Sequence, residues 1–159
     1  MKRIKLILII CICFPFLGSA QHGGTTFTSS IGVKSLRIGT KYTSVQIETI
    51  FGGSPTTYCS SISEFGLDEG YQYENSWFSF AENGMFVGFN ITSDNFAVFE
   101  QYNGGVRVGN LISKVTQLGA GGTLVAKPDG KYEWWLGDEV MYFRVENDII
   151  VRIYYNASV

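Results

Sequence analysis

The chain has 159 residues, of which 45% are hydrophobic, 15% aromatic and only 16% charged. This composition excludes a disordered chain and fits one compact β-rich domain, or two very small ones. The only histidine, His22, excludes most catalysis by a nucleophile–histidine pair and most histidine-ligated metal sites. We therefore predict a non-enzymatic protein without a cofactor or a metal.

Residues 1–20 have the organisation of a secretory signal peptide. Basic residues precede an apolar run from Leu6 to Leu17, and small residues precede Gln21. The apolar run is shorter than the roughly 20 residues that span a bilayer. We expect cleavage after Ala20, which gives an exported chain, periplasmic or secreted, with no membrane span.

Cleavage would leave 9 basic and 14 acidic side chains, a net charge of −5. Because phosphate backbones and anionic lipids attract clustered Lys and Arg, neither nucleic acid nor a membrane surface is an expected partner. Cleavage would also leave Cys59 as the only cysteine. A small half-buried residue is the favoured interpretation of Cys59, with a reactive thiol or an intermolecular link as the alternatives.

Residues 21–35 are rich in Gly, Thr and Ser and predict a flexible lead-in with room for a short strand at its end. A short helix is expected next. Thr40 or Thr43 would cap its start and Gly52 its end. The apolar stripe of this helix would consist of Tyr42, Val45, Thr49, Ile50 and Phe51.

The same order of elements recurs about seventy residues later. Aligning Gly39 with Gly109 also aligns Val45 with Val115, and both predicted helices run into glycine. Strands are expected at 71–74, 77–80, 85–91 and 96–99 after the first helix, and at 132–136, 140–145 and 149–155 after the second, with turns at 82–84 and 137–139. The pattern predicts two tandem repeats, 36–104 and 105–159, with a single α+β domain as the alternative.

The openings Ile38-Gly39-Thr40 and Val108-Gly109-Asn110, the glycine-rich helix ends and the strand Tyr132-Glu133-Trp134 carry a family resemblance. Residues 36–155 resemble the repeat of β-lactamase inhibitory proteins, and are similar to the small lipoprotein subunit of the outer-membrane β-barrel assembly machine. The resemblance implies an α+β fold. Each repeat would pack a short helical segment on an antiparallel sheet, and the sheets would merge into one concave, protein-binding surface. The chain lacks the lipid-attachment cysteine of the lipoproteins and the paired cysteines of the inhibitors.

Strand alternation separates the two faces of the predicted sheet. Met141, Phe143 and Val145 form the expected core face of their strand. The opposite face would carry aromatic and arginine side chains, the residue types that dominate protein–protein hot spots. The predicted partner-binding residues on that face are Trp135, Tyr142, Arg144, Arg152, Tyr154 and Phe86.

A second candidate surface is the predicted loop 63–71, with Asp68, Glu69 and Tyr71 as its binding residues. Residues 21–104 carry 3 basic and 8 acidic side chains, which would steer a basic partner. The sequence as a whole predicts an exported protein-binding module, inhibitor- or immunity-like. The alternatives are a cell-envelope scaffold and a domain that binds a small molecule or a glycan.

Overall fold

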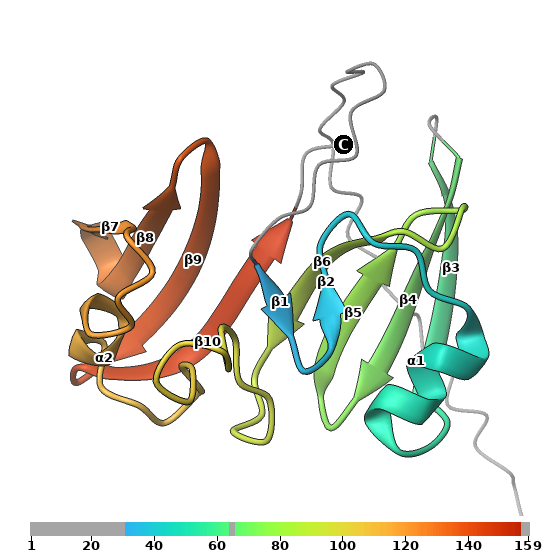
Figure 1. Cartoon of the computed structure of the whole chain (residues 1–159), viewed down its shortest axis with the longest axis horizontal. Coiled ribbons are helices and arrows are strands. Elements are labelled where there is room, and N and C mark those ends of the chain that lie inside the picture. The colour runs from blue at the N-terminus through green and yellow to red at the C-terminus, as the bar shows by residue number, and fades with distance from the viewer. Residues whose placement is uncertain (1–30, 64–65, 157–159) are drawn as a thin grey trace, which may run out of the picture.

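The computed structural model of the chain describes residues 31–63 and 66–156, and the side chains of 61–68 and 156 are outside this description. The expected signal peptide, and the lead-in as far as residue 30, therefore lie outside the described residues. The elements, labelled in Figure 1, are β1 Gly32–Val33, β2 Leu36–Arg37, α1 Ser44–Phe51, β3 Thr57–Ser63, β4 Gly66–Tyr73, β5 Ser76–Phe80, β6 Phe86–Ile91, α2 Ser113–Thr116, β7 Thr123–Lys127, the 3-10 turn η1 Pro128–Gly130, β8 Lys131–Leu136, β9 Glu139–Glu146 and β10 Ile149–Asn156.

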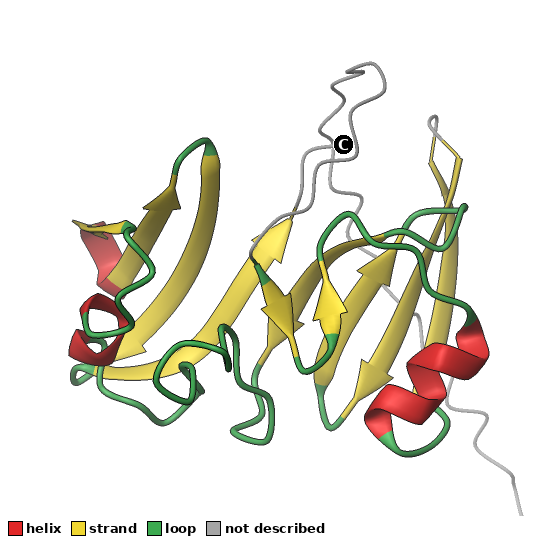
Figure 2. Cartoon of the chain, in the orientation of Figure 1, coloured by secondary structure: helices red, strands yellow, loops and turns green. Residues whose placement is uncertain are grey.

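Eight of the strands form one antiparallel sheet in the order β3-β4-β5-β6-β10-β9-β8-β7. Two four-stranded meanders thus meet edge to edge, because β6 pairs with β10. Figure 2 shows that strands dominate the chain and that helices are few, which agrees with the α+β class expected from the sequence. The described helices include none long and apolar enough to cross a membrane.

One face of the sheet carries the hydrophobic core. Figure 1 shows α1 and the β1–β2 ribbon on the near side of the sheet. Phe51 of α1 stacks on Tyr73, with ring centroids 4.0 Å apart, and also contacts Phe78. The core side chains of the inner strands include Phe78, Phe80, Phe89, Ile91, Met141, Phe143 and Ile153, all at most 3% exposed. We call this side of the sheet the covered face.

The bounds of α1 agree with the prediction, but its buried stripe does not. Thr43 is the N-cap and exchanges hydrogen bonds with Gln46 in a capping box, and Gly52 ends the helix with a φ of 81°. Val45 is 71% exposed, however, whereas Ile47 is the buried residue. In a helix of two turns, packing against the sheet, here through Phe51 on Tyr73 and Phe78, decides which side faces inward, and the spacing of three residues does not.

The second helix is much shorter than predicted. α2 has only four residues, and no side chain caps its start. Its Val115 is 1% exposed, whereas Val45, with which the sequence alignment matched it, is 71% exposed, so the two positions differ in burial.

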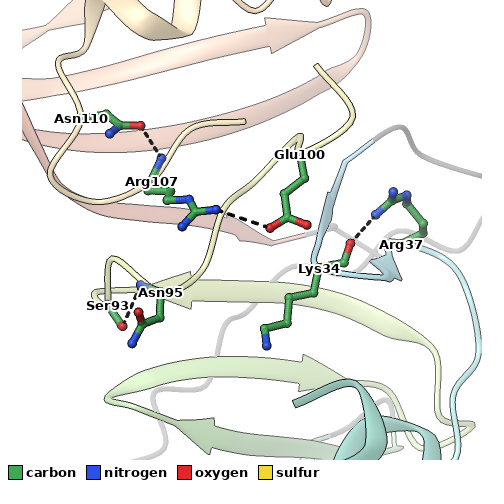
Figure 3. Close-up of polar contacts among 7 residues, drawn as sticks. All are labelled: Lys34, Arg37, Ser93, Asn95, Glu100, Arg107 and Asn110. Atoms are coloured by element: carbon green, nitrogen blue, oxygen red, sulfur yellow. Dashed lines mark hydrogen bonds and ion pairs between the residues drawn. The ribbon is translucent and has the colours of Figure 1, made fainter. Parts of the chain in front are cut away.

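The connection from β6 to α2 crosses the covered face instead of forming the strand predicted at 96–99. Val98 makes only isolated bridges, to Val33 and Val106, although it is fully buried. Figure 3 shows the polar contacts of this connection, among them the ion pair between Arg107 and Glu100 at 4.0 Å. The backbone N–H of Arg107 donates to the side-chain oxygen of Asn110 at 3.0 Å.

Two irregularities reverse the alternation on which the predicted faces depended. On β6, Phe86 pairs with Phe80 and Gly88 with Ser79, so Val87 is an additional residue. Phe86 therefore lies on the covered face and is fully buried, which corrects its assignment to the binding surface. A similar shift on β10 makes Val151 an additional residue, so that Ile150 is fully buried although regular alternation would place it on the same face as Arg152 and Tyr154.

Candidate functional site

The second face of the sheet, which we call the open face, carries half-buried and exposed side chains. One row of residues in mutual register crosses all eight strands of this face. From edge to edge, this central row is Thr57, Gln72, Trp77, Asn90, Tyr154, Tyr142, Glu133 and Val125. The five predicted residues Trp135, Tyr142, Arg144, Arg152 and Tyr154 all lie on the open face, in the half formed by β7 to β10.

The middle of the open face is built around two stacked tyrosines. The rings of Tyr142 and Tyr154 lie 4.9 Å apart with an interplanar angle of 9°. The guanidinium of Arg152 lies 5.6 Å from the ring centroid of Tyr154, and its Nε donates a hydrogen bond to Asn90 Oδ1 at 2.6 Å. These contacts join β9, β10 and β6 and hold an aromatic and a cationic group at the junction of the two meanders.

Trp135 lies farther toward the β7 edge and is 43% exposed. Its indole Nε1 donates to Glu133 Oε2 at 3.0 Å, and Lys127 Nζ forms an ion pair with the same oxygen at 2.9 Å. The hydrogen bond from Lys127 is the main reason why the pKa of Glu133 lies below its usual value. The carboxylate thus stays ionised and orients the neighbouring indole.

A second row, parallel to the central one, consists of four cations. Lys127 pairs with Lys131, Lys131 with Arg144, and Arg144 with Arg152, on β7, β8, β9 and β10. We call these four residues the basic row. Like charges directly opposite one another destabilise a sheet. Among the described side chains, Lys127 is the only member of the basic row with an acidic partner, Glu133. Arg152 donates to the neutral amide of Asn90. Within the same part of the chain, Lys131 and Arg144 form no ion pair and no side-chain hydrogen bond.

Three residues of the basic row, Lys131, Arg144 and Arg152, line a shallow pocket of about 310 Å³ together with Tyr154. Burial raises the pKa of Tyr154 above its usual value, and the neighbouring Tyr142 adds to this effect although Arg152 opposes it. The Tyr154 hydroxyl therefore remains a neutral donor at physiological pH. Three cations and one hydroxyl donor suit an anionic group.

The predicted loop 63–71 is a β-hairpin, since β3 and β4 pair through Thr57 and Gln72 up to Ser63 and Gly66. Tyr71 is 7% exposed and packs against Phe80 on the covered face. Glu69 accepts hydrogen bonds from the hydroxyls of Tyr58 and Tyr71, each at 3.1 Å. The side chain of Asp68 lies outside the described residues. Glu69 and Tyr71 are thus on the side of the sheet opposite the stacked tyrosines and do not form one site with them.

Sequence reasoning missed Lys131, Glu133, Trp77 and Asn90 on the open face. Alternation from Trp135 would have placed Glu133 and Lys131 on the same face, two and four residues earlier. The register that aligns Lys131 with Arg144 and Arg152 carries no such local signal.

Within the described ranges, no group of three or more His, Cys, Asp or Glu side chains is arranged to hold a metal ion. Cys59 is half-buried on the open face of β3, as the favoured interpretation expected, and it is disulfide-bonded. Comparisons with protein-family models, curated proteins and solved structures find no match to this chain.

Proposed function

We propose that the chain is an exported, non-enzymatic module, built from two copies of one unit, that binds another protein through the open face of its sheet. In this proposal each copy is a short helix followed by a four-stranded meander, α1 with β3 to β6 and α2 with β7 to β10. The sheet order supports a duplication, because the last strands of the two meanders, β6 and β10, pair with each other and extend one surface.

Matching hydrogen bonds at the start of each unit support the duplication further. The N–H of Gly39 donates to the Phe86 carbonyl at 2.9 Å, and the N–H of Gly109 donates to the Ile150 carbonyl at 2.8 Å. The strand residue returns a bond in each unit: the Phe86 N–H donates to the Thr40 carbonyl, and the Ile150 N–H donates to the Asn110 carbonyl. A third pair follows, in which the Tyr42 N–H donates to the Gly84 carbonyl and the Ile112 N–H donates to the Asp148 carbonyl. In both units the next strand residue, Val87 after Phe86 and Val151 after Ile150, is the additional residue of a bulge.

This correspondence matches β6 with β10, and therefore β4 and β5 with β8 and β9, which shifts the strand alignment made from sequence by one hairpin. It matches the β8–β9 turn with the β4–β5 turn at 74–75 instead of the turn at 82–84. Under the corrected alignment Tyr71 corresponds to Tyr132, and Phe78 to Phe143, all on the covered face.

The observation that carries the binding proposal is a cluster of half-buried and exposed side chains on a face that the helices leave uncovered: Trp135 and Arg152 are exposed, and Tyr142, Arg144 and Tyr154 are half-buried. Trp, Tyr and Arg dominate binding hot spots because each buries a large area with few rotatable bonds and retains a polar group. Stacking of the tyrosines and the hydrogen bond from Arg152 to Asn90 reduce the entropy lost when a partner docks. The cluster is therefore preorganised for a protein surface.

The test begins with capture of proteins from the source cells, identification of the captured protein by mass spectrometry, and its purification. Binding of this partner is then measured by calorimetry for the native chain and for a Trp135→Ala, Tyr142→Ala variant. We expect the double variant to lose about thirtyfold or more in affinity, since truncation of even one hot-spot residue costs about 2 kcal/mol or more.

The control is Tyr58→Ala, which removes a 50% exposed aromatic side chain from the covered side of β3. Its affinity should stay within a few-fold of the native chain. Circular dichroism must show native folding for every variant. Equal affinities for the double variant and the native chain would refute binding through the open face.

A further inference from the structure

The basic row is not required by the fold. In the other meander the residues at the corresponding register positions are Gly70, Ser79 and Gly88, which pair with one another as Lys131, Arg144 and Arg152 do. The same sheet is thus built once with three small neutral residues and once with three cations. A row of like charges that the fold does not need, and that repel one another, indicates a ligand of opposite charge.

The charges around the row limit the size of that ligand. Four strands at about 4.8 Å spacing make the row about 14 Å long. Glu133 lies beside it on β8, and Glu146 follows Arg144 by two residues on β9, so an acidic side chain flanks the row on each side. A long polyanion would meet both of these carboxylates, whereas one or two compact carboxylates fit between them.

We propose that Lys131, Arg144, Arg152 and Tyr154 bind a carboxylate that an acidic segment of the partner protein presents to the open face. This inference rests on the proposed function and names the chemistry of the partner. Two guanidinium groups supply paired donors that match a carboxylate, the Lys131 ammonium adds a third charge, and the Tyr154 hydroxyl adds a neutral donor. The Tyr142 ring, stacked on Tyr154, supplies an adjacent apolar contact.

The test measures binding of a fluorescent, C-terminally amidated diglutamate peptide, which carries two compact carboxylates, to the purified chain by anisotropy. We expect saturable binding that weakens with salt and falls about tenfold or more in Arg144→Glu and in Lys131→Glu. The matched control is Arg107→Glu, which changes the net charge equally but lies near Glu100 in the connection on the covered face. Its affinity should remain within about twofold of the native chain.

No binding of the diglutamate peptide, or equal losses in Arg144→Glu and Arg107→Glu, would overturn the inference. Tighter binding of duplex DNA or of phosphatidylglycerol vesicles, lost in the same variants, would also overturn it and assign the row to phosphate. The two proposals fail separately. If Arg144→Glu keeps full affinity for the captured partner while Trp135→Ala, Tyr142→Ala loses it, the carboxylate site is wrong and the proposed function stands.

Discussion

Replacing Arg144 with glutamate should stabilise the protein, contrary to the usual effect of a charge reversal. Arg144 is directly opposite Lys131 and Arg152 in the sheet. Two unit charges in water interact with about 1 kcal/mol at 4 Å, and with about half of that at roughly twice the distance. Reversal converts two repulsions of about 0.5 kcal/mol into attractions of similar size, a gain of about 2 kcal/mol.

Glu146 opposes part of this gain, because its attraction to Arg144 becomes a repulsion of similar size. The net increase in the free energy of unfolding is then about 1 kcal/mol, which corresponds to a rise in Tm of about 3 °C. Arg107→Glu should lower Tm by a smaller amount, since it replaces the Arg107–Glu100 ion pair with a repulsion between exposed groups.

Thermal unfolding followed by circular dichroism at about 10 mM and about 1 M salt separates these effects from packing changes. The Debye length shrinks from about 30 Å to about 3 Å between these conditions, so both shifts should disappear in high salt. A lower Tm for Arg144→Glu in low salt, or a shift of equal size in high salt, would refute electrostatic strain in the basic row.

Three further perturbations test packing, capping and titration. Phe78→Ala should lower the free energy of unfolding by about 3–5 kcal/mol, because Phe78 is fully buried. Val45→Ala should change it by less than about 0.5 kcal/mol, because Val45 is exposed. Urea denaturation measures both changes, and similar losses in the two variants would contradict the position of α1. In the same assay Thr43→Ala should cost about 1 kcal/mol through loss of the capping box, and an unchanged midpoint would contradict the cap. Burial, with a hydrogen bond to Glu69, raises the pKa of Tyr71 from 10.0 to about 12. The contribution of this shift to stability is therefore complete below pH 10 and is lost as the pH rises through 12. Ultraviolet titration of the native chain against Tyr71→Phe measures this pKa, and ionisation of Tyr71 near pH 10 would contradict the shift.

Sequence alternation predicted the faces of the sheet wherever a strand runs without irregularity. On β9 it placed Met141, Phe143 and Val145 in the core, and the structure confirms all three. It failed at Phe86, which lies before a bulge that reverses the alternation. A bulge arises from strand pairing and from the connection that packs against the strand, and the local sequence contains neither.

The edge strands β3 and β7 escaped prediction because little of their stability comes from burial. In β7, four of five side chains are exposed. Such strands are held by the hydrogen bonds of one neighbouring strand, so the apolar pattern that reveals an inner strand is weak or absent. The helix caps Thr43 and Gly52, by contrast, act within a few residues and were predictable.

The basic row shows why the site itself was only partly predictable. Arg144 and Arg152 were assigned to the open face from their own strands, but the electrostatic problem they create exists only after β8, β9 and β10 align. Positions on the covered face accept similar residues in both meanders, because each must fill the same layer beneath a helix or a connection. Positions on the open face are not bound by this requirement, and there Gly70 and Ser79 stand where the other meander has Lys131 and Arg144. If one unit was duplicated, the two halves therefore kept similar residues on the covered face, where packing constrains them. They diverged on the open face, where only a partner can constrain the residues, which is the reason to look for function there.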